Sequence, residues 1–193
     1  MVGPDDVLAF WLDECQPEDW YKAEPAFDAK IRDRFLTTWE AATEGALGLW
    51  LTYPGGTLAY IILTDQFPRN MFRGEGKAFA TDYLGLAAAK MAVERQWDLK
   101  IDEPARQFFY LPLMHSENLC DQDRAVRLIH TRMPEKGDGN IDHARAHRQV
   151  IRDFGRFPYR NAALGRKTTD AEQRFLDDGG YGAAIRAQRA AAG

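Results

Sequence analysis

Large apolar side chains recur every three to four residues along most of this chain, and that spacing limits what it can fold into. Phe27, Ile31, Phe35 and Trp39 follow one another at intervals of four, which places them on one face of a helix. No window alternates apolar and polar residues for long enough to require a strand. The pattern therefore predicts an all-α fold of antiparallel helix pairs joined by short loops.

We expect about eight helices, whose limits are set by prolines, glycines and capping residues. The expected ranges are a short first helix from residue 4, then residues 25–43, 58–67, 75–96, 103–114, 117–133 and 142–154. A capping box from Thr169 to Glu172 should open a last short helix. The helix over 58–67 should stop near Phe67, because the residue before a proline disfavours the α region. Ser116 is the expected N-cap of the helix that follows Pro112.

Length and composition predict one soluble domain. The 193 residues, 45% of them hydrophobic, suffice for one core, so we expect a single helical domain over 1–193 with a mobile tail at 179–193. The N-terminus lacks the features of a signal peptide and no apolar run spans a bilayer, which favours the cytoplasm and excludes a membrane partner. A net charge of -4 argues against nucleic acid. Cys15 and Cys120 lack disulfide or zinc spacing, which favours buried, reduced thiols.

Two similar motifs, DQFPRN and FGRFPYRN, concentrate hydrogen-bond donors after Phe-Pro. Each proline should leave the next backbone N–H groups free beside arginine and asparagine side chains, which is a suitable arrangement for an anion. Between residues 145 and 167, seven basic residues accompany a single acid. The predicted ligand-binding residues are Asp65, Arg69, Asn70, Arg73, Arg156, Arg160, Asn161 and Arg166. In the alternative interpretation, Glu117, Glu172 and helix C-terminal carbonyls take up these arginines, and Asp65 pairs with one to hold a helix end.

Three residues are candidates for acid or base catalysis: His115, Glu117 and His147. His115 and Glu117 follow the kink expected at Pro112, and His147 lies on the apolar face of its helix. The alternative for His115 is a core ring bonded to a carbonyl. His143 and His147 have the i, i+4 spacing of metal ligands, but no HExxH glutamate and no third ligand accompany them. We therefore predict neither a metal nor a cofactor.

Several long motifs resemble the bacterial family called domain of unknown function 924. They are LTDQFPRNMFRG, AFATDYLGLA, QFFYLPLMHSEN and HRQVIRDFGRFPYRNAALGRKTTDAEQRFL. The resemblance implies a tetratricopeptide-like all-α fold, a right-handed helical array, and no established activity. Similar proteins often have FPHRN where this chain has Tyr159. We leave Tyr159 out of the catalytic candidates, because a phenol is a poor proton acceptor at neutral pH.

These observations favour a site for a small anion, a carboxylate or phosphate, between the two Phe-Pro motifs, and leave open whether the protein is an enzyme. The alternative is a tetratricopeptide-like interaction module that binds an acidic peptide, although a repeat of 34 residues is absent. RNA ranks third, since few aromatic residues accompany the basic ones. Trp20, Tyr21, Trp50 and Trp97 are candidates for a homodimer surface, with core packing as the alternative.

Overall fold

The computed structural model describes residues 1–192, and its regular structure is entirely helical. No strand occurs in this range, so the predicted all-α class is confirmed. The chain divides into two compact units, Met1–Pro112 and Leu113–Gly193. Within the described range, no helix has the length and apolar character needed to cross a membrane. The tetratricopeptide-like arrangement stays a prediction.

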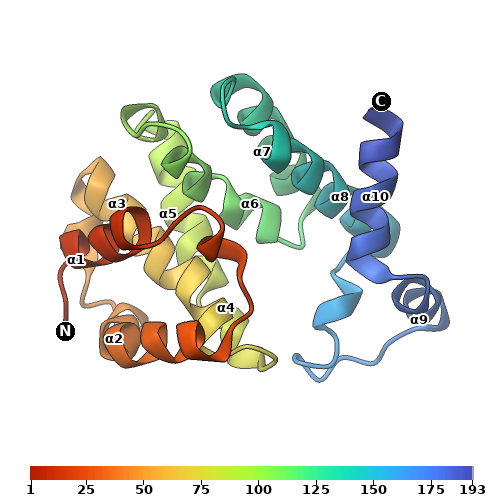
Figure 1. The fold of residues 1–193 in the computed structure, drawn as a ribbon, viewed down its shortest axis with the longest axis horizontal. Helices are drawn as coiled ribbons and strands as arrows, with labels where there is room; N and C mark the ends of the chain where they lie inside the picture. The colour runs from red at the N-terminus through yellow and green to blue at the C-terminus, as the bar shows by residue number, and fades with distance from the viewer. Residues whose placement is uncertain (193) are drawn as a thin grey trace. The chain divides into compact units, whose positions relative to one another are not determined.

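Helices of three kinds build the N-terminal unit. The α-helices are α1 (Pro4–Leu8), α2 (Pro25–Thr43), α3 (Pro54–Ile61), α4 (Phe67–Met71) and α5 (Asp82–Glu94). Two segments have π-helical hydrogen bonding, η1 (Ala9–Glu14) and η4 (Ile62–Gln66). The 3₁₀ turns are η2 (Asp19–Tyr21), η3 (Gly48–Thr52), η5 (Gly76–Phe79), η6 (Asp98–Lys100) and η7 (Ala105–Phe109). Figure 1 shows α3 lying against α1 and α5.

Aromatic rings form the centre of this unit. Ile31, Phe35 and Trp39 of α2 are buried, as their spacing predicts. The ring centroids of Phe35 and Phe67 are 4.5 Å apart, and the Trp11 ring meets Phe67 edge-on at 5.3 Å. Tilted and edge-on contacts of this kind stabilise a core beyond the area they bury. The apolar face of α2 therefore fixes the position of α4, which carries the first Phe-Pro motif.

The expected helix end at Phe67 is wrong. Phe67 has φ -59° and ψ -37°, within the α region, and α4 continues to Met71. Pro68 lies in the first turn of α4, where backbone N–H groups have no intrahelical partner, so its missing N–H costs little. The π turn η4 precedes it and widens the spiral, which accommodates the proline ring. The chain thus changes helix type at the proline instead of leaving the helix.

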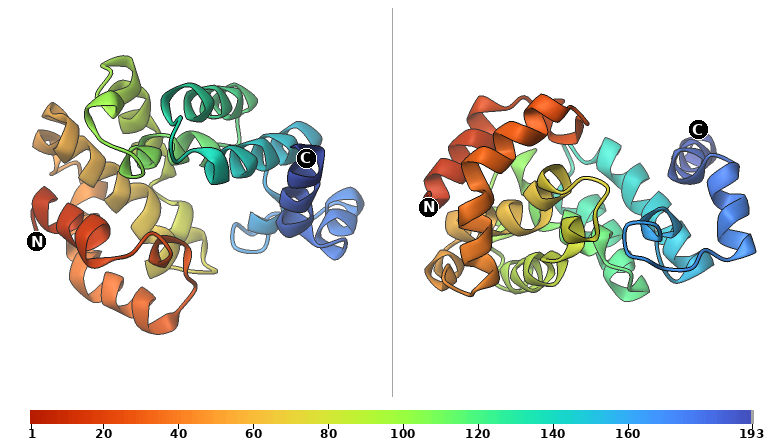
Figure 2. Two further views of the ribbon diagram at one scale, coloured as in Figure 1. Left: turned by 45° about the horizontal axis from the view of Figure 1, so that its top comes forward. Right: turned by 90° about the horizontal axis from the view of Figure 1, so that it is seen from below.

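The C-terminal unit consists of three longer helices and several short ones. The elements are α6 (Leu111–His115), which begins at the unit boundary, α7 (Leu119–Arg132), α8 (Asp138–Phe154), η8 (Pro158–Arg160), α9 (Asp170–Asp177) and α10 (Gly180–Ala192). Helix α8 packs against both α7 and α10, as Figure 2 shows. The segment expected to be a mobile tail contains α10, whose Ile185 is buried against its unit. Gly193, the last residue of that tail, lies outside the described residues.

Several expected boundaries are corrected. The helix expected over 75–96 is a 3₁₀ turn followed by α5, and that over 103–114 is a 3₁₀ turn followed by α6. Ser116 is not the N-cap of α7: the Asn118 side chain accepts from the Cys120 N–H at 2.9 Å, while the Ser116 hydroxyl donates to Asp121 at 2.8 Å. Helix α8 starts four residues earlier than expected. The capping box at Thr169 is confirmed, and Cys120 is exposed, contrary to expectation.

Candidate functional site

The first Phe-Pro motif holds its arginines against carboxylates of its own unit. Asp65 is fully buried in η4, and its side chain accepts from Gln66. Arg69 donates to both oxygens of Asp82 on α5, at 2.9 and 3.0 Å, and to the backbone oxygen of Asp65. A two-point pair of this kind fixes the guanidinium in one orientation. Arg69 therefore joins α4 to α5.

Asn70 and Arg73 converge on one carboxylate, that of Asp28 in α2. The Asn70 amide donates to Asp28 at 2.8 Å, and Arg73 donates to both oxygens at 2.7 and 2.9 Å. Asp28 and Asp82 were not among the predicted site residues, because each reads as an ordinary polar position of an amphipathic helix. The donors of the first motif thus hold α2, α4 and α5 together.

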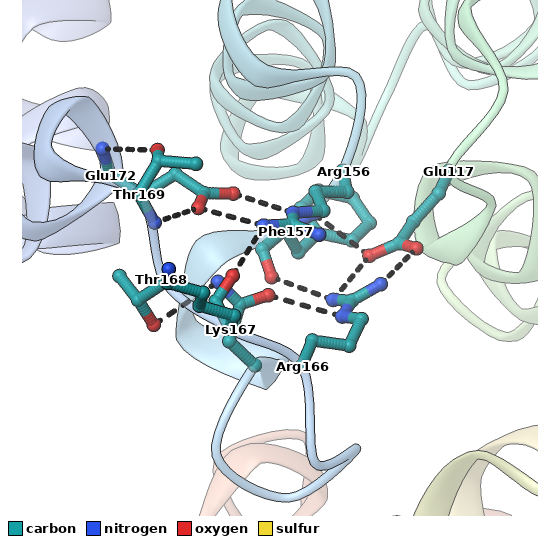
Figure 3. Close-up of polar contacts among 9 residues, drawn as sticks. Glu117, Arg156, Phe157, Arg166, Lys167, Thr168, Thr169 and Glu172 are labelled. Atoms are coloured by element: carbon teal, nitrogen blue, oxygen red, sulfur yellow. Dashed lines mark hydrogen bonds and ion pairs between the residues drawn. The ribbon is translucent and has the colours of Figure 1, made fainter.

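The second Phe-Pro motif begins where α8 ends. Gly155 has φ 69°, a left-handed conformation that suits glycine, and its N–H bonds to Ile151 at 2.8 Å. Arg156 then donates to the two oxygens of Glu172 at 2.5 and 2.8 Å (Figure 3). The same carboxylate accepts from the Thr169 N–H at 2.7 Å as part of the capping box. Glu172 therefore secures both the start of α9 and the arginine that follows α8.

Glu117 binds the middle of the same motif (Figure 3). Its carboxylate accepts from Arg166 at 2.7 and 3.0 Å and from the backbone N–H of Phe157 at 2.8 Å. Arg166 also donates to Asn161 at 3.0 Å. Burial acts to raise the pKa of Glu117, but Arg166, the Phe157 N–H and Arg160 outweigh it, and the pKa is lowered. Glu117 is therefore an ionised anchor of the loop.

For Arg156 and Arg166, these contacts match the alternative interpretation of the sequence, in which Glu172 and Glu117 take up the arginines. Asn161 is buried, and its side chain accepts from Arg166 and donates to Thr168 within the same loop. The two motifs lie in different units, and a joint site between them stays a prediction.

A second group in the C-terminal unit contains histidine and tyrosine rings. His115 of α6 and His147 of α8 are half-buried, with ring centroids 6.2 Å apart. The Tyr181 ring of α10 lies 4.6 Å from that of His147, and its hydroxyl is 3.2 Å from Nδ1 of His147 and 2.6 Å from Nδ1 of His143. The structure therefore brings together both predicted catalytic histidines, with a tyrosine that the sequence analysis did not identify.

Hydrogen bonding fixes the tautomer of His147. Its Nδ1 lies 2.8 Å from the carbonyl oxygen of His143, and a carbonyl can only accept, so Nδ1 carries the proton. The Tyr181 oxygen accepts a second branch of this bond, while its O–H donates to Nδ1 of His143. The lone pair of neutral His147 is consequently on Nε2. Burial, together with the neighbouring His115 and Arg160, lowers the pKa of His147 to about 3.

Arg160 brings positive charge to this group. The residue is 7% exposed, and its guanidinium carbon lies 4.4 Å from the centroid of the Phe157 ring. The same ring meets His147 edge-on at 5.3 Å and stacks on Tyr159 at 5.3 Å. A guanidinium stacked on an aromatic face loses part of its hydration and interacts more strongly with anions. Phe157 thus positions Arg160 beside the histidines.

Tyr181 was missed because it follows two glycines in a segment read as a tail, where sequence spacing gives no sign of a partner on α8. Tyr159 is 38% exposed and its ring lies 5.9 Å from that of Tyr181.

The predicted absence of a metal concerned His143 and His147. The Nδ1 atoms of both rings are directed to Tyr181 or a backbone carbonyl. Among residues 1–192, no three His, Cys, Asp or Glu side chains are grouped as metal ligands.

The family model described as "Bacterial protein of unknown function (DUF924)" matches residues 7–180. The chain belongs to this family. A protein of known structure is similar over most of its length: the "Protein of Unknown Function ATU0120 from Agrobacterium tumefaciens" is 38% identical, with a TM-score of 0.84, and the match covers 91% of this chain and 97% of that one. A search of curated proteins finds no match. The resemblance noted in the sequence is thus confirmed, and the family description assigns no activity.

Proposed function

We propose that the C-terminal unit binds a small anion, a carboxylate or phosphate, at His115, His147 and Arg160. The observation that supports this most is the environment of His147. Its half-buried ring is neutral and lies between a second imidazole and a tyrosine, close enough to the buried Arg160 for that charge to lower its pKa. The positive charge of Arg160 disfavours a second positive charge on His147, and for the same reason it favours a negatively charged ligand beside the two residues.

The arginines differ in how well they suit this role. Arg156 and Arg166 are each bound at two points by a carboxylate, which offsets their charge. Arg160 also stacks on Phe157, and its charge acts on both Glu117 and His147, lowering the pKa of each. For this reason we favour a small anion near Arg160 over an acidic peptide, which would need several available arginines along a groove.

The proposed chemistry is proton transfer through Nε2 of His147. Because Nδ1 is held as a donor to the His143 carbonyl, Nε2 is the atom that accepts a proton from a bound acid. A bound anion would offset the charge of Arg160 and raise the pKa of His147 toward its ordinary value. Ligand binding and base strength are therefore coupled, and an enzyme of this design would gain its base when the substrate binds.

The test is an NMR titration of the full chain, followed through the histidine ring resonances, in sodium phosphate and in sodium chloride of equal ionic strength. We expect phosphate, and not chloride, to raise the pKa of His147 above about 3. Arg160→Lys should weaken the effect of phosphate, because a compact ammonium does not reproduce a stacked, planar guanidinium.

An unchanged pKa of His147 in phosphate would count against the proposal. So would an equal response in wild type and Arg160→Lys with the helical content preserved. In either case the cluster would be a structural arrangement that joins α8 to α10.

A further inference from the structure

A cleft in the C-terminal unit lies apart from the histidine group, where the end of α7 meets the start of α8. Its volume is about 430 Å³, within the range of roughly 300–1,000 Å³ typical of small-molecule sites. Its floor is apolar, with Ile129 and Met133, and its accessible lining combines Pro134 and Ile141 with His130 and two charged residues, Asp138 and Arg145. In the sequence, Arg145 stands out only as the first member of the basic run over 145–167, and Asp138 was not singled out.

The apolar wall is formed before any ligand arrives. Ile129 is 1% exposed and Met133 3%, so their positions are set by the packing of the unit. The connection between the helices is equally constrained: a Cβ added to Gly137 would lie 2.4 Å from the Met133 backbone oxygen. Gly137 also donates to that oxygen at 3.1 Å and accepts from the Ile141 N–H at 2.8 Å. A rigid turn of this kind keeps the cleft open at little entropic cost to binding.

Arg145 and Asp138 have opposite charges but do not pair with each other. Within residues 1–192, neither side chain makes a hydrogen bond or ion pair with another protein group. Arg148, one turn along α8, does reach a carboxylate, that of Asp123 at 3.4 Å. A single charge without a partner is ordinary at a protein surface. In this cleft, however, two opposite charges line the same small space, and the two side chains are too far apart to form an ion pair with each other.

We propose that this cleft binds a small zwitterion with an apolar body, of the class of α-amino acids with aliphatic side chains. The carboxylate of the ligand pairs with Arg145, its ammonium pairs with Asp138, and its side chain lies against Ile141 and Pro134, the accessible apolar residues of the lining. A guanidinium binds a carboxylate at two points, which gives Arg145 the larger share of the affinity. The ligand replaces the water around two charges with charge-assisted hydrogen bonds and covers apolar surface at the same time.

This site is independent of the anion site proposed above. Arg145 precedes His147 by two residues, and a helix turns about 100° per residue, so the two side chains leave α8 on nearly opposite sides. Loss of binding in the cleft therefore has no necessary effect on the pKa of His147, and the two proposals fail separately.

The experiment measures binding to the full chain by NMR chemical-shift titration with L-leucine as the probe. Two analogues each lack one charge: 4-methylpentanoate has no ammonium, and 3-methylbutylamine has no carboxylate. We expect L-leucine to shift the resonances of Ile129 and Ile141 and to bind wild type at least about tenfold more tightly than either analogue, since each lost charge removes a charge-assisted bond.

The variants are Arg145→Ala, Asp138→Asn and, as a matched control, Arg152→Ala. Arg152 lies two turns along α8, is exposed, and is not part of the cleft lining. Arg145→Ala should weaken L-leucine binding by about tenfold or more, whereas Arg152→Ala should leave it unchanged. No binding of L-leucine to wild type, equal binding to Arg145→Ala, or equal affinity for the analogues would each overturn the proposal. The comparison of L-leucine with its two analogues uses the wild-type protein alone, so it tests the proposal even if a variant does not fold.

Discussion

Replacing Glu117 by alanine should destabilise the C-terminal unit more than its position at the surface of a loop suggests. Within residues 1–192, the substitution removes the acceptor of the Phe157 N–H, and Phe157 is fully buried. A buried donor left without a partner costs about 1–3 kcal/mol. The pair with Arg166 adds less, about 0.5–1 kcal/mol, because the two side chains are 28% and 22% exposed and solvent screens them.

The expected total is about 1.5–4 kcal/mol. In a chain of 193 residues this corresponds to a fall in melting temperature of about 3–16 °C. Glu117→Gln separates the two contributions, because its amide oxygen still accepts from Phe157 but no longer carries the charge that attracts Arg166. We expect Glu117→Gln to lose less than half of the stability that Glu117→Ala loses.

Urea unfolding followed by far-UV circular dichroism measures both variants. Tryptophan emission is a second probe of the same samples, because all five tryptophans belong to the N-terminal unit: Trp11, Trp20, Trp39, Trp50 and Trp97. The dichroism midpoint should move further than the emission midpoint. If Glu117→Ala and Glu117→Gln are equally destabilising, or if neither moves the dichroism transition, then the Phe157 N–H does not depend on this carboxylate and the reasoning is wrong.

Three other substitutions, and a fourth as a control, test separate parts of the C-terminal unit. The pKa of His147 in the folded state, about 3, is below its value in the unfolded state. The contribution of this residue to stability is therefore complete above about pH 6.5 and is lost as the pH falls toward 3. With His147→Gln, the free energy of unfolding measured in urea should change less across that pH interval. Thr169→Ala removes the N-cap of α9 and should cost about 1 kcal/mol in chemical denaturation. Gly155→Ala places a side chain at φ 69° and should lower the free energy of unfolding by about 1–2 kcal/mol, whereas Gly139→Ala, in open space on α8, should leave it unchanged or raise it.

Part of the fold follows from local patterns that act over one or two helical turns. The four-residue spacing in α2 predicts the face that the structure buries. The pattern of Thr169 and Glu172 predicts a capping box, because the two side chains reach backbone groups only three residues away. Pro68 was misread for a related reason: the rule for the residue before proline applies to a regular α-helix, and a π turn ahead of the proline removes the conflict.

The candidate site depended on contacts that no local pattern contains. The sequence identified the arginines and named Glu117 and Glu172 as possible partners, but Asp28 and Asp82 are indistinguishable in sequence from other exposed acids. Asp28 is 45 positions from Arg73, and Tyr181 is 34 positions from His147. Over such separations the partner of a side chain is determined by how the helices pack.

The sequence by itself determined the helical class, the buried face of α2, the N-cap of α9 and membership of the family, because periodicity, capping and long motifs are properties of neighbouring residues. The tertiary structure alone decided which carboxylate holds each arginine, that Arg160 stacks on Phe157, and that His115, His147 and Tyr181 share one environment. The physical reason is that ion pairs and pKa shifts depend on distances of a few ångströms and on burial. Those quantities exist only once the helices have packed.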